Sequence, residues 1–144
     1  MAFGAGKSGV FQLDNGAGSL QTLSAYINKA DISLTIAMLD TTVFSLNAET
    51  VLPGLKAADK IQISGPLDPT LHTHFGTIYN NGGGLTTGNG SLSFVLGPMG
   101  STTGNPKFTG ECFLSKYAPG AEVKGLATWS VELTITGGVT SDVY

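Results

Sequence analysis

The stretch TWSVELTITG at residues 128–137 alternates strictly between apolar and polar side chains. Its apolar members are Trp129, Val131, Leu133 and Ile135, and the residues between them and after them are Ser130, Glu132, Thr134 and Thr136. Successive side chains of a β-strand point to opposite faces of a sheet, so this pattern predicts a strand with one buried and one solvated face. Such strands are typical of antiparallel sheets.

The same alternation occurs in other parts of the chain. It runs through residues 31–39 (Ile32, Leu34, Ile36 and Met38 on one face) and through residues 91–96 (Leu92, Phe94 and Leu96 opposite Ser91, Ser93 and Val95). Shorter strands are predicted at residues 10–13, 20–28 and 61–65, and an extended segment at 107–117 before a turn at Pro119-Gly120. We expect the apolar faces to pack together in one core.

One helix is predicted, and its start and end are both marked. Asp68 suits the N-cap, Pro69 suits the first helical position, and Gly82 suits the left-handed C-terminal cap. The apolar stripe of the helix consists of Leu71, Phe75 and Ile78. A helix of about three turns is marginal alone, so we expect the stripe to pack on the sheet.

The length of 144 residues fits a single domain, 1–144. Residues 1–9 are glycine-rich and are predicted to form a flexible N-terminal arm, whereas residues 40–60 form a long inter-strand loop. Because that loop carries apolar residues, we expect it to contact other molecules during assembly. Its candidates for contacts between assembled rings are Val43, Phe44, Val51, Leu52, Pro53 and Leu55.

The composition argues against several functional classes. Charged residues make up 12%, the net charge is −3, and every basic residue is a lysine. Specific nucleic-acid binding normally shows a basic patch rich in arginine, which this chain lacks. The single cysteine, Cys112, permits no intrachain disulfide. No apolar run is long enough for a membrane span, so membrane insertion is not expected.

No motif in the sequence predicts catalysis. His72 and His74 are two residues apart on the predicted helix and point in nearly opposite directions, so they do not form a metal-binding pair. There is no nucleophile elbow, and no pair stands out among the scattered carboxylates. We therefore expect a structural protein without catalytic residues, cofactor or metal.

Three segments in order resemble the tail tube (major tail) proteins of long-tailed, siphovirus-like bacteriophages, over about residues 30–138. DTTVF at residues 40–44 leads to LPGLK at residues 52–56, the helix unit follows at residues 68–79, and GECFLS at residues 110–115 precedes the strand at 129–137. Ser45 stands where many relatives have glycine, so the conformation of that loop is not carried over.

The resemblance implies an antiparallel β-sandwich or open barrel with one flanking helix. Subunits of this family form hexameric rings, which stack into a tube through which phage DNA passes. The implied partners are further copies of the chain, the tape measure, tail terminator and distal tail or baseplate proteins, and transiently double-stranded DNA. The implied location is the virion tail, assembled in the host cytoplasm.

Physical reasoning agrees with this implication, because a lone sheet leaves edge strands with unpaired backbone groups. Pairing those edges between copies would close a wide barrel. Its lumen should be polar but should not hold phosphates, which favours hydroxyls and sparse carboxylates over basic residues. The candidates for the lumen are Ser91, Ser93, Glu111, Ser130, Glu132, Thr134 and Thr136.

Two alternatives remain open. A ligand-binding β-sandwich, such as a carbohydrate-binding module, would need exposed aromatic residues or a calcium-binding cluster. Trp129 instead lies on an apolar strand face. A secretion-tube component or a virion decoration protein would share the structural role and the β-rich pattern.

Overall fold

The computed structural model describes residues 6–44, 47–56, 59–86, 88 and 90–144. Seven strands form one antiparallel sheet in the order β2-β1-β7-β8-β9-β6-β3, and β4 and β5 form a separate hairpin. The elements are η1 (Gly6–Ser8), β1 (Val10–Asp14), β2 (Leu20–Thr22), η2 (Ser24–Tyr26), β3 (Lys29–Ile32), β4 (Ile36–Asp40), β5 (Val51–Lys56), β6 (Lys60–Pro66), α1 (Pro69–Asn80), β7 (Leu92–Gly97), β8 (Pro106–Gly120) and β9 (Thr128–Val143). None of the helices in these ranges is long and apolar enough to cross a membrane.

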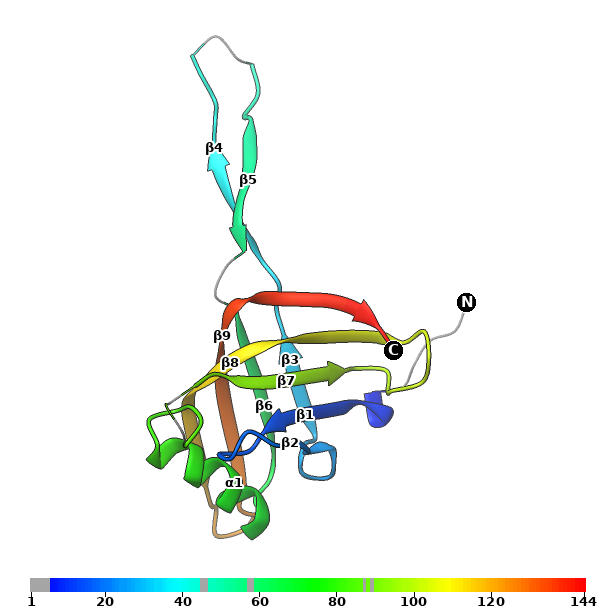
Figure 1. The fold of residues 1–144 in the computed structure, drawn as a ribbon, viewed down its shortest axis with the longest axis vertical. Coiled ribbons are helices and arrows are strands. Elements are labelled where there is room, and N and C mark those ends of the chain that lie inside the picture. The colour runs from blue at the N-terminus through cyan, green and yellow to red at the C-terminus, as the bar shows by residue number, and fades with distance from the viewer. Residues whose placement is uncertain (1–5, 45–46, 57–58, 87, 89) are drawn as a thin grey trace.

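The long strands β8 and β9 each belong to two layers. The first half of β8 and the second half of β9 pair together beside β7, β1 and β2, and their other halves form a second layer with β6 and β3. The ladder shifts after Gly110, and Gly137 and Gly138 take positive φ angles of 78° and 82° where β9 turns between layers. In Figure 1 the first layer runs across the view and the second runs from top to bottom. The predicted fold class is confirmed.

The core lies between the two layers and is closed on one side by α1. The predicted apolar faces of β7 and β9 and the helix stripe are all buried, as are Phe11 and Leu13 of β1. The Phe75 ring lies 5.5 Å from the ring of Trp129 and 5.8 Å from that of Tyr117. Trp129 donates its indole N–H to the Pro66 carbonyl at 2.9 Å, which satisfies its buried polar atom.

The helix begins and ends as predicted. The Asp68 carboxylate accepts a hydrogen bond of 2.8 Å from the Thr70 amide, and Pro69 occupies the first turn. Gly82 has a φ of 83°, which a residue with a side chain rarely adopts. The Gly83 amide donates back to the Ile78 carbonyl at 2.9 Å. These bonds satisfy backbone groups that the helix ends leave free.

The prediction of one core strand at residues 31–39 is wrong. β3 ends at Ile32 and β4 begins at Ile36, and Leu34, Ile36 and Met38 are 46–57% exposed instead of lying in the core. The chain leaves the sheet at Thr35, whose amide and hydroxyl both donate to the Asp59 carboxylate, at 3.1 and 2.8 Å. Alternation predicts strand conformation but does not tell which molecule covers the apolar face.

Three smaller expectations also differ from the structure. The strand predicted at 20–28 is limited to β2, because η2 follows it. Pro119-Gly120 lies inside β8 and not in a turn. The last strand, β9, does not end at Gly137 but continues to Val143. Of the predicted N-terminal arm at residues 1–9, residues 1–5 lie outside the described residues, and Gly6–Ser8 form η1.

Gly65 of β6 lies against the backbone of Tyr26, the last residue of η2. A Cβ at this position would overlap the carbonyl oxygen of Tyr26. We expect Gly65→Ala to lower the free energy of unfolding by about 1–3 kcal/mol, as overpacking does. Gly120→Ala is the control, because its Cβ would meet nothing within 4 Å, and it should change stability by less than about 0.5 kcal/mol. Urea unfolding of both variants tests this; equal costs would contradict the prediction.

Candidate assembly surfaces

The hairpin of β4 and β5 projects away from the body of the protein (Figure 1). We call residues 36–56 the arm. Its base is closed by the Thr35–Asp59 hydrogen bonds, and towards its tip the Thr41 amide donates to the Thr50 carbonyl at 2.9 Å. The Asp40 carboxylate accepts from the Thr42 amide at 2.9 Å, and this bond lowers the pKa of Asp40. At its base the arm is tied to the body by Lys56, whose Nζ donates to the Val139 carbonyl at 3.4 Å, and beyond Lys56 the hydrogen bonds of its described residues are local to the hairpin.

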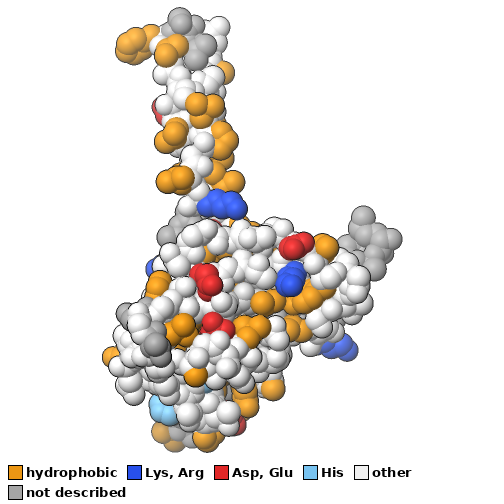
Figure 2. Space-filling view, viewed as in Figure 1, with side chains coloured by type: hydrophobic (Ala, Val, Ile, Leu, Met, Phe, Trp, Pro, Cys, Tyr) orange, Lys and Arg blue, Asp and Glu red, His pale blue; other side chains and the backbone are white. Residues whose placement is uncertain are grey.

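Apolar side chains cover the arm on both faces. Leu39 pairs with Leu52 in the ladder and Met38 with Pro53, and Phe44 near the tip is fully exposed. All the predicted inter-ring residues are solvent-exposed: Val43, Phe44, Val51, Leu52, Pro53 and Leu55. Figure 2 shows hydrophobic side chains along the whole length of the projection. A two-stranded hairpin is marginal in water, and apolar surface of this kind marks an interaction site.

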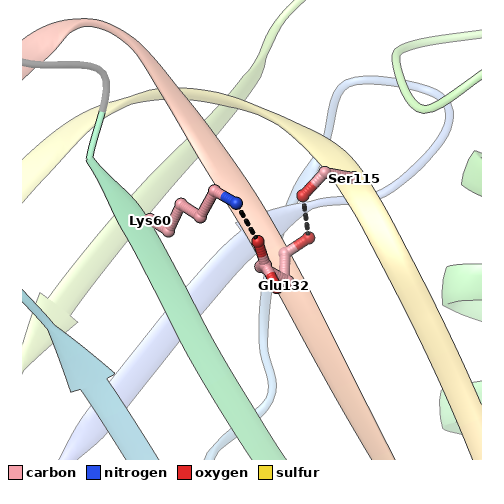
Figure 3. Close-up of polar contacts among 3 residues, drawn as sticks. All are labelled: Lys60, Ser115 and Glu132. Atoms are coloured by element: carbon pink, nitrogen blue, oxygen red, sulfur yellow. Dashed lines mark hydrogen bonds and ion pairs between the residues drawn. The ribbon is translucent and has the colours of Figure 1, made fainter.

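The outer face of the second layer is polar and carries paired charges. The Lys60 Nζ lies 2.6 Å from the Glu132 Oε1, and the Ser115 hydroxyl donates to the Glu132 carbonyl at 2.8 Å (Figure 3). A second, exposed pair joins Lys29 and Asp31 at 3.6 Å. The neighbouring residues on this face are Gln62, Ser64, Lys116, Ser130 and Thr134.

The first layer has a separate polar face. The Ser93 hydroxyl lies 3.0 and 2.9 Å from the two carboxylate oxygens of Glu111, and Glu111 pairs with Thr136. The predicted lumen residues are thus divided between layers. Ser130, Glu132 and Thr134 lie on the second layer and Ser93 lies on the first, whereas Glu111 and Thr136 pair with each other at the corner between the layers and Ser91 immediately precedes β7.

The sequence analysis names Glu132 of the second-layer face but misses its other charged residues, among them Lys29, Asp31 and Lys60. Lys29 and Asp31 alternate with Ala30 and Ile32 in β3, and Lys60, Gln62 and Ser64 alternate with buried residues in β6. That alternation was the signal that could have found them. Lys29 and Lys60 lie just outside the strands predicted at residues 31–39 and 61–65, so the prediction assigned neither lysine to a face.

The second layer has two open edges. β3 pairs only with β6, and β8 from Lys116 to Gly120 pairs only with β9 among the described strands. Both edges present backbone N–H and C=O groups to solvent, which is a template for pairing with another chain. The layer is therefore a four-stranded unit that can be extended on either side.

The ionisable groups near the core do not form a reactive site. Burial raises the pKa of the Cys112 thiol to about 12, with the charges of Glu111 and Asp14 adding to the shift, so the thiolate needed for nucleophilic chemistry is absent at neutral pH. Within the described residues, no group of three His, Cys, Asp or Glu side chains is placed to hold a metal ion.

Burial lowers the pKa of His74, although the nearby Asp14 partly offsets this effect. Because the pKa of His74 is lower in the folded protein, the unfolded chain binds the proton at a higher pH than the folded chain does. The unfolding free energy therefore falls as the pH drops below about 6.5. We expect the unfolding free energy to fall between pH 7.5 and 5.5, and His74→Gln to reduce that fall. His72→Gln, on an exposed face of the same helix, is the control and should retain the His74-dependent fall. An unchanged pH dependence in His74→Gln would contradict this.

Comparison with known proteins supports the architecture. No family model and no curated protein matches the sequence. Among solved structures, the tail of an empty gene transfer agent particle refined with C6 symmetry is similar, with a TM-score of 0.75, 16% identity, and 96% of this chain and 98% of that chain covered. The SPP1 tail tube is similar at a TM-score of 0.72, with 14% identity and 97% and 79% covered.

A contractile assembly shares the fold as well. The sheath-tube complex of the extracellular contractile injection system PVC matches at a TM-score of 0.65, with 11% identity and 93% and 88% covered. At sequence identities of 11–16%, these similarities establish the fold alone. The chain thus has the fold of tail tube proteins over nearly its full length, which confirms the fold implied by the sequence resemblance.

Proposed function

We propose that this chain is the structural subunit of a phage-type tail tube. Copies form hexameric rings, the rings stack, and double-stranded DNA passes through the central channel. The observation that carries the proposal is the nearly full-length likeness to the tail of a gene transfer agent particle, whose C6 symmetry supports six copies per ring. The protein's place would be the virion tail, after assembly in the host cytoplasm.

Of the two polar faces, that of the second layer is proposed to line the channel. β3 precedes the arm in the chain and β6 follows it, and in Figure 1 both strands run roughly along the direction in which the arm projects. If the arm reaches the next ring, the second layer follows the tube axis, as the strands of a barrel wall must do with some tilt. Six four-stranded layers joined at their open edges form a barrel wide enough for an aqueous channel.

This assignment changes the expected chemistry of the channel wall. The wall contains lysines, contrary to the expectation of hydroxyls and sparse carboxylates alone. Lys60 faces the Glu132 carboxylate at 2.6 Å, Lys116 is opposite Glu132 in the ladder, and Lys29 makes only an exposed pair with Asp31 at the edge of the layer. A lysine held by a carboxylate neutralises a phosphate less well than a free one, so DNA is attracted weakly. Glu132, Ser130 and Thr134 remain proposed lumen residues; Ser91, Ser93, Glu111 and Thr136 would face elsewhere.

The exposed arm is proposed to join successive rings. Its six candidate residues are covered only when copies assemble, which removes the apolar surface that the isolated subunit presents. The tape measure, the tail terminator and the distal tail or baseplate proteins would then meet the lumen and the two ends of the tube. In this role the chain needs neither catalytic residues nor a cofactor.

A second candidate function is that of the ring that ends a tube. The tube-terminating cap of the anti-feeding prophage has a TM-score of 0.72 with this chain, at 11% identity and with 100% and 93% covered. Electron microscopy of the purified protein separates the two functions. A tube subunit polymerises into long tubes, whereas a terminator stops at single rings; a protein that remains monomeric at all concentrations contradicts both.

Single cysteines test which face lines the channel, because buried Cys112 should not react with maleimides. Ser130→Cys places a thiol on the second-layer face, and Thr140→Cys places one on the first, where Thr140 pairs with Thr109. Both native residues are exposed in the subunit. In long tubes, Ser130→Cys should react with a small maleimide but be protected from one carrying a large polymer. Equal reaction with both reagents at Ser130→Cys, together with protection at Thr140→Cys, would reverse the assignment.

A further inference from the structure

An apolar pocket lies at the corner where the two layers fail to meet. β1 and β3 belong to opposite ends of the strand order and share no ladder, so the sandwich is left open between them. Phe11 and Leu96 are opposite each other in the β1–β7 ladder and are buried at 2% and 5% exposure. The pocket measures about 350 Å³, and its apolar lining consists of Val10, Phe11, Ile27, Ala30, Leu96 and Pro98.

The pocket and the arm lie at opposite ends of the same strand. Lys29 and Ala30, at the start of β3, line the pocket, whereas the arm departs after Ile32, where β3 ends. If a second copy is stacked on the first along the direction of the arm, the arm of the first copy points towards the end of the second copy that carries the pocket. A contact between two different surfaces of identical chains is heterologous, and it repeats without limit when copies are stacked.

The two surfaces are complementary in size and charge. An engineered apolar cavity of roughly 150 Å³ already binds benzene, so this pocket has room for a leucine or phenylalanine side chain. Asp40 and Glu49 are the charged residues between positions 40 and 50, and both are acidic. Lys29 at the pocket rim is 71% exposed and makes only an exposed pair with Asp31, so it is available to a partner's carboxylate.

We infer that this pocket receives an apolar side chain of the arm from a second copy of the chain. The inference rests on the proposed tube function and adds to it the surface on which each arm lands. One contact then covers the exposed apolar arm and fills the partly buried apolar pocket. The nine residues from Ile36 to Phe44, at about 3.3 Å each, give the arm a reach of about 30 Å beyond the body.

Cross-linking between two proteins that each carry one added cysteine besides the buried Cys112 tests this contact. One protein carries Asn28→Cys, an exposed position at the pocket; the other carries Phe44→Cys near the arm tip or Leu52→Cys in its middle. The control is Gln21→Cys, which is equally exposed but lies on β2 outside this pocket. After co-assembly and treatment with a short bis-maleimide, Asn28→Cys should give a covalent dimer with at least one arm variant, several-fold above the Gln21→Cys control.

A blocking variant gives an independent readout. Asn28→Trp should cover the pocket mouth and raise the protein concentration needed for assembly at least tenfold, whereas Gln21→Trp should leave it unchanged. Tubes that form normally with Asn28→Trp, or arm cysteines that cross-link equally to Gln21→Cys, overturn the pocket contact while the tube function stands. Wild-type protein that never assembles overturns both.

Discussion

Replacing residues 36–58 with Asn-Gly should give a folded protein that no longer stacks into tubes. The cut falls between Thr35 and Asp59, whose hydrogen bonds close the base of the arm and survive the change. No residue of the arm belongs to the buried core, so the unfolding temperature should stay within a few degrees of that of the wild type. Sedimentation velocity, circular dichroism and electron microscopy measure oligomeric state, folding and tube formation.

A matched variant separates the arm's length from its apolar surface. Leu39→Ser together with Leu52→Ser keeps the hairpin but removes a facing leucine pair, each 57% exposed in the subunit. Full burial of one leucine contributes about 1.5–3 kcal/mol, and 57% of each of these side chains is left to cover, so the pair contributes about 2–3 kcal/mol if the interface covers it fully. The concentration needed for assembly should rise by about one to two orders of magnitude. Tubes formed by the deleted protein at wild-type concentration would contradict the role of the arm.

The helix and β9 were predictable because each is decided by local chemistry. Asp68, Pro69 and Gly82 mark the ends of α1, and the alternation from Trp129 to Ile135 admits one buried face. In both elements the residues that the sequence pattern marks as apolar are the ones buried in the core, so prediction and structure agree. The arm was misassigned for the opposite reason: its alternation resembles that of β9, but the surface that would cover it is not in the same subunit.

The division of the polar residues between two layers was predictable only in part, because alternation along a strand does not reveal where a long strand passes from one layer to the other. Ser93 and Ser130 both alternate with buried residues along their strands and so both face solvent, yet they lie on different layers. The change depends on the ladder shift after Gly110 and on the positive φ angles of Gly137 and Gly138. In the sequence these glycines are compatible with a simple strand end, which is how the segment was interpreted.

Glu132→Lys should convert the tube into one that retains DNA. The substitution removes the partner of Lys60, which lies 2.6 Å from the carboxylate, and places a third amine beside Lys60 and Lys116. In every subunit, lysines that were neutralised by a carboxylate become available to phosphates, and each phosphate contact releases counterions. A fluorescent duplex oligonucleotide should co-sediment with the variant tubes at low salt and be released as salt rises, with binding falling linearly on logarithmic axes.

The controls decide whether the position or merely the charge matters. Glu122→Lys produces the same net charge in the loop between β8 and β9, away from the Lys60–Glu132 pair, and should not retain the duplex if that loop faces the outside of the tube. Glu132→Gln removes the carboxylate without adding an amine, so it frees Lys60 and should give intermediate retention. Equal binding by the Glu122→Lys and Glu132→Lys tubes would mean that DNA adheres to the outer surface. The absence of binding by Glu132→Lys, in tubes that assemble normally, would place Glu132 outside the channel and exclude the second layer as its wall.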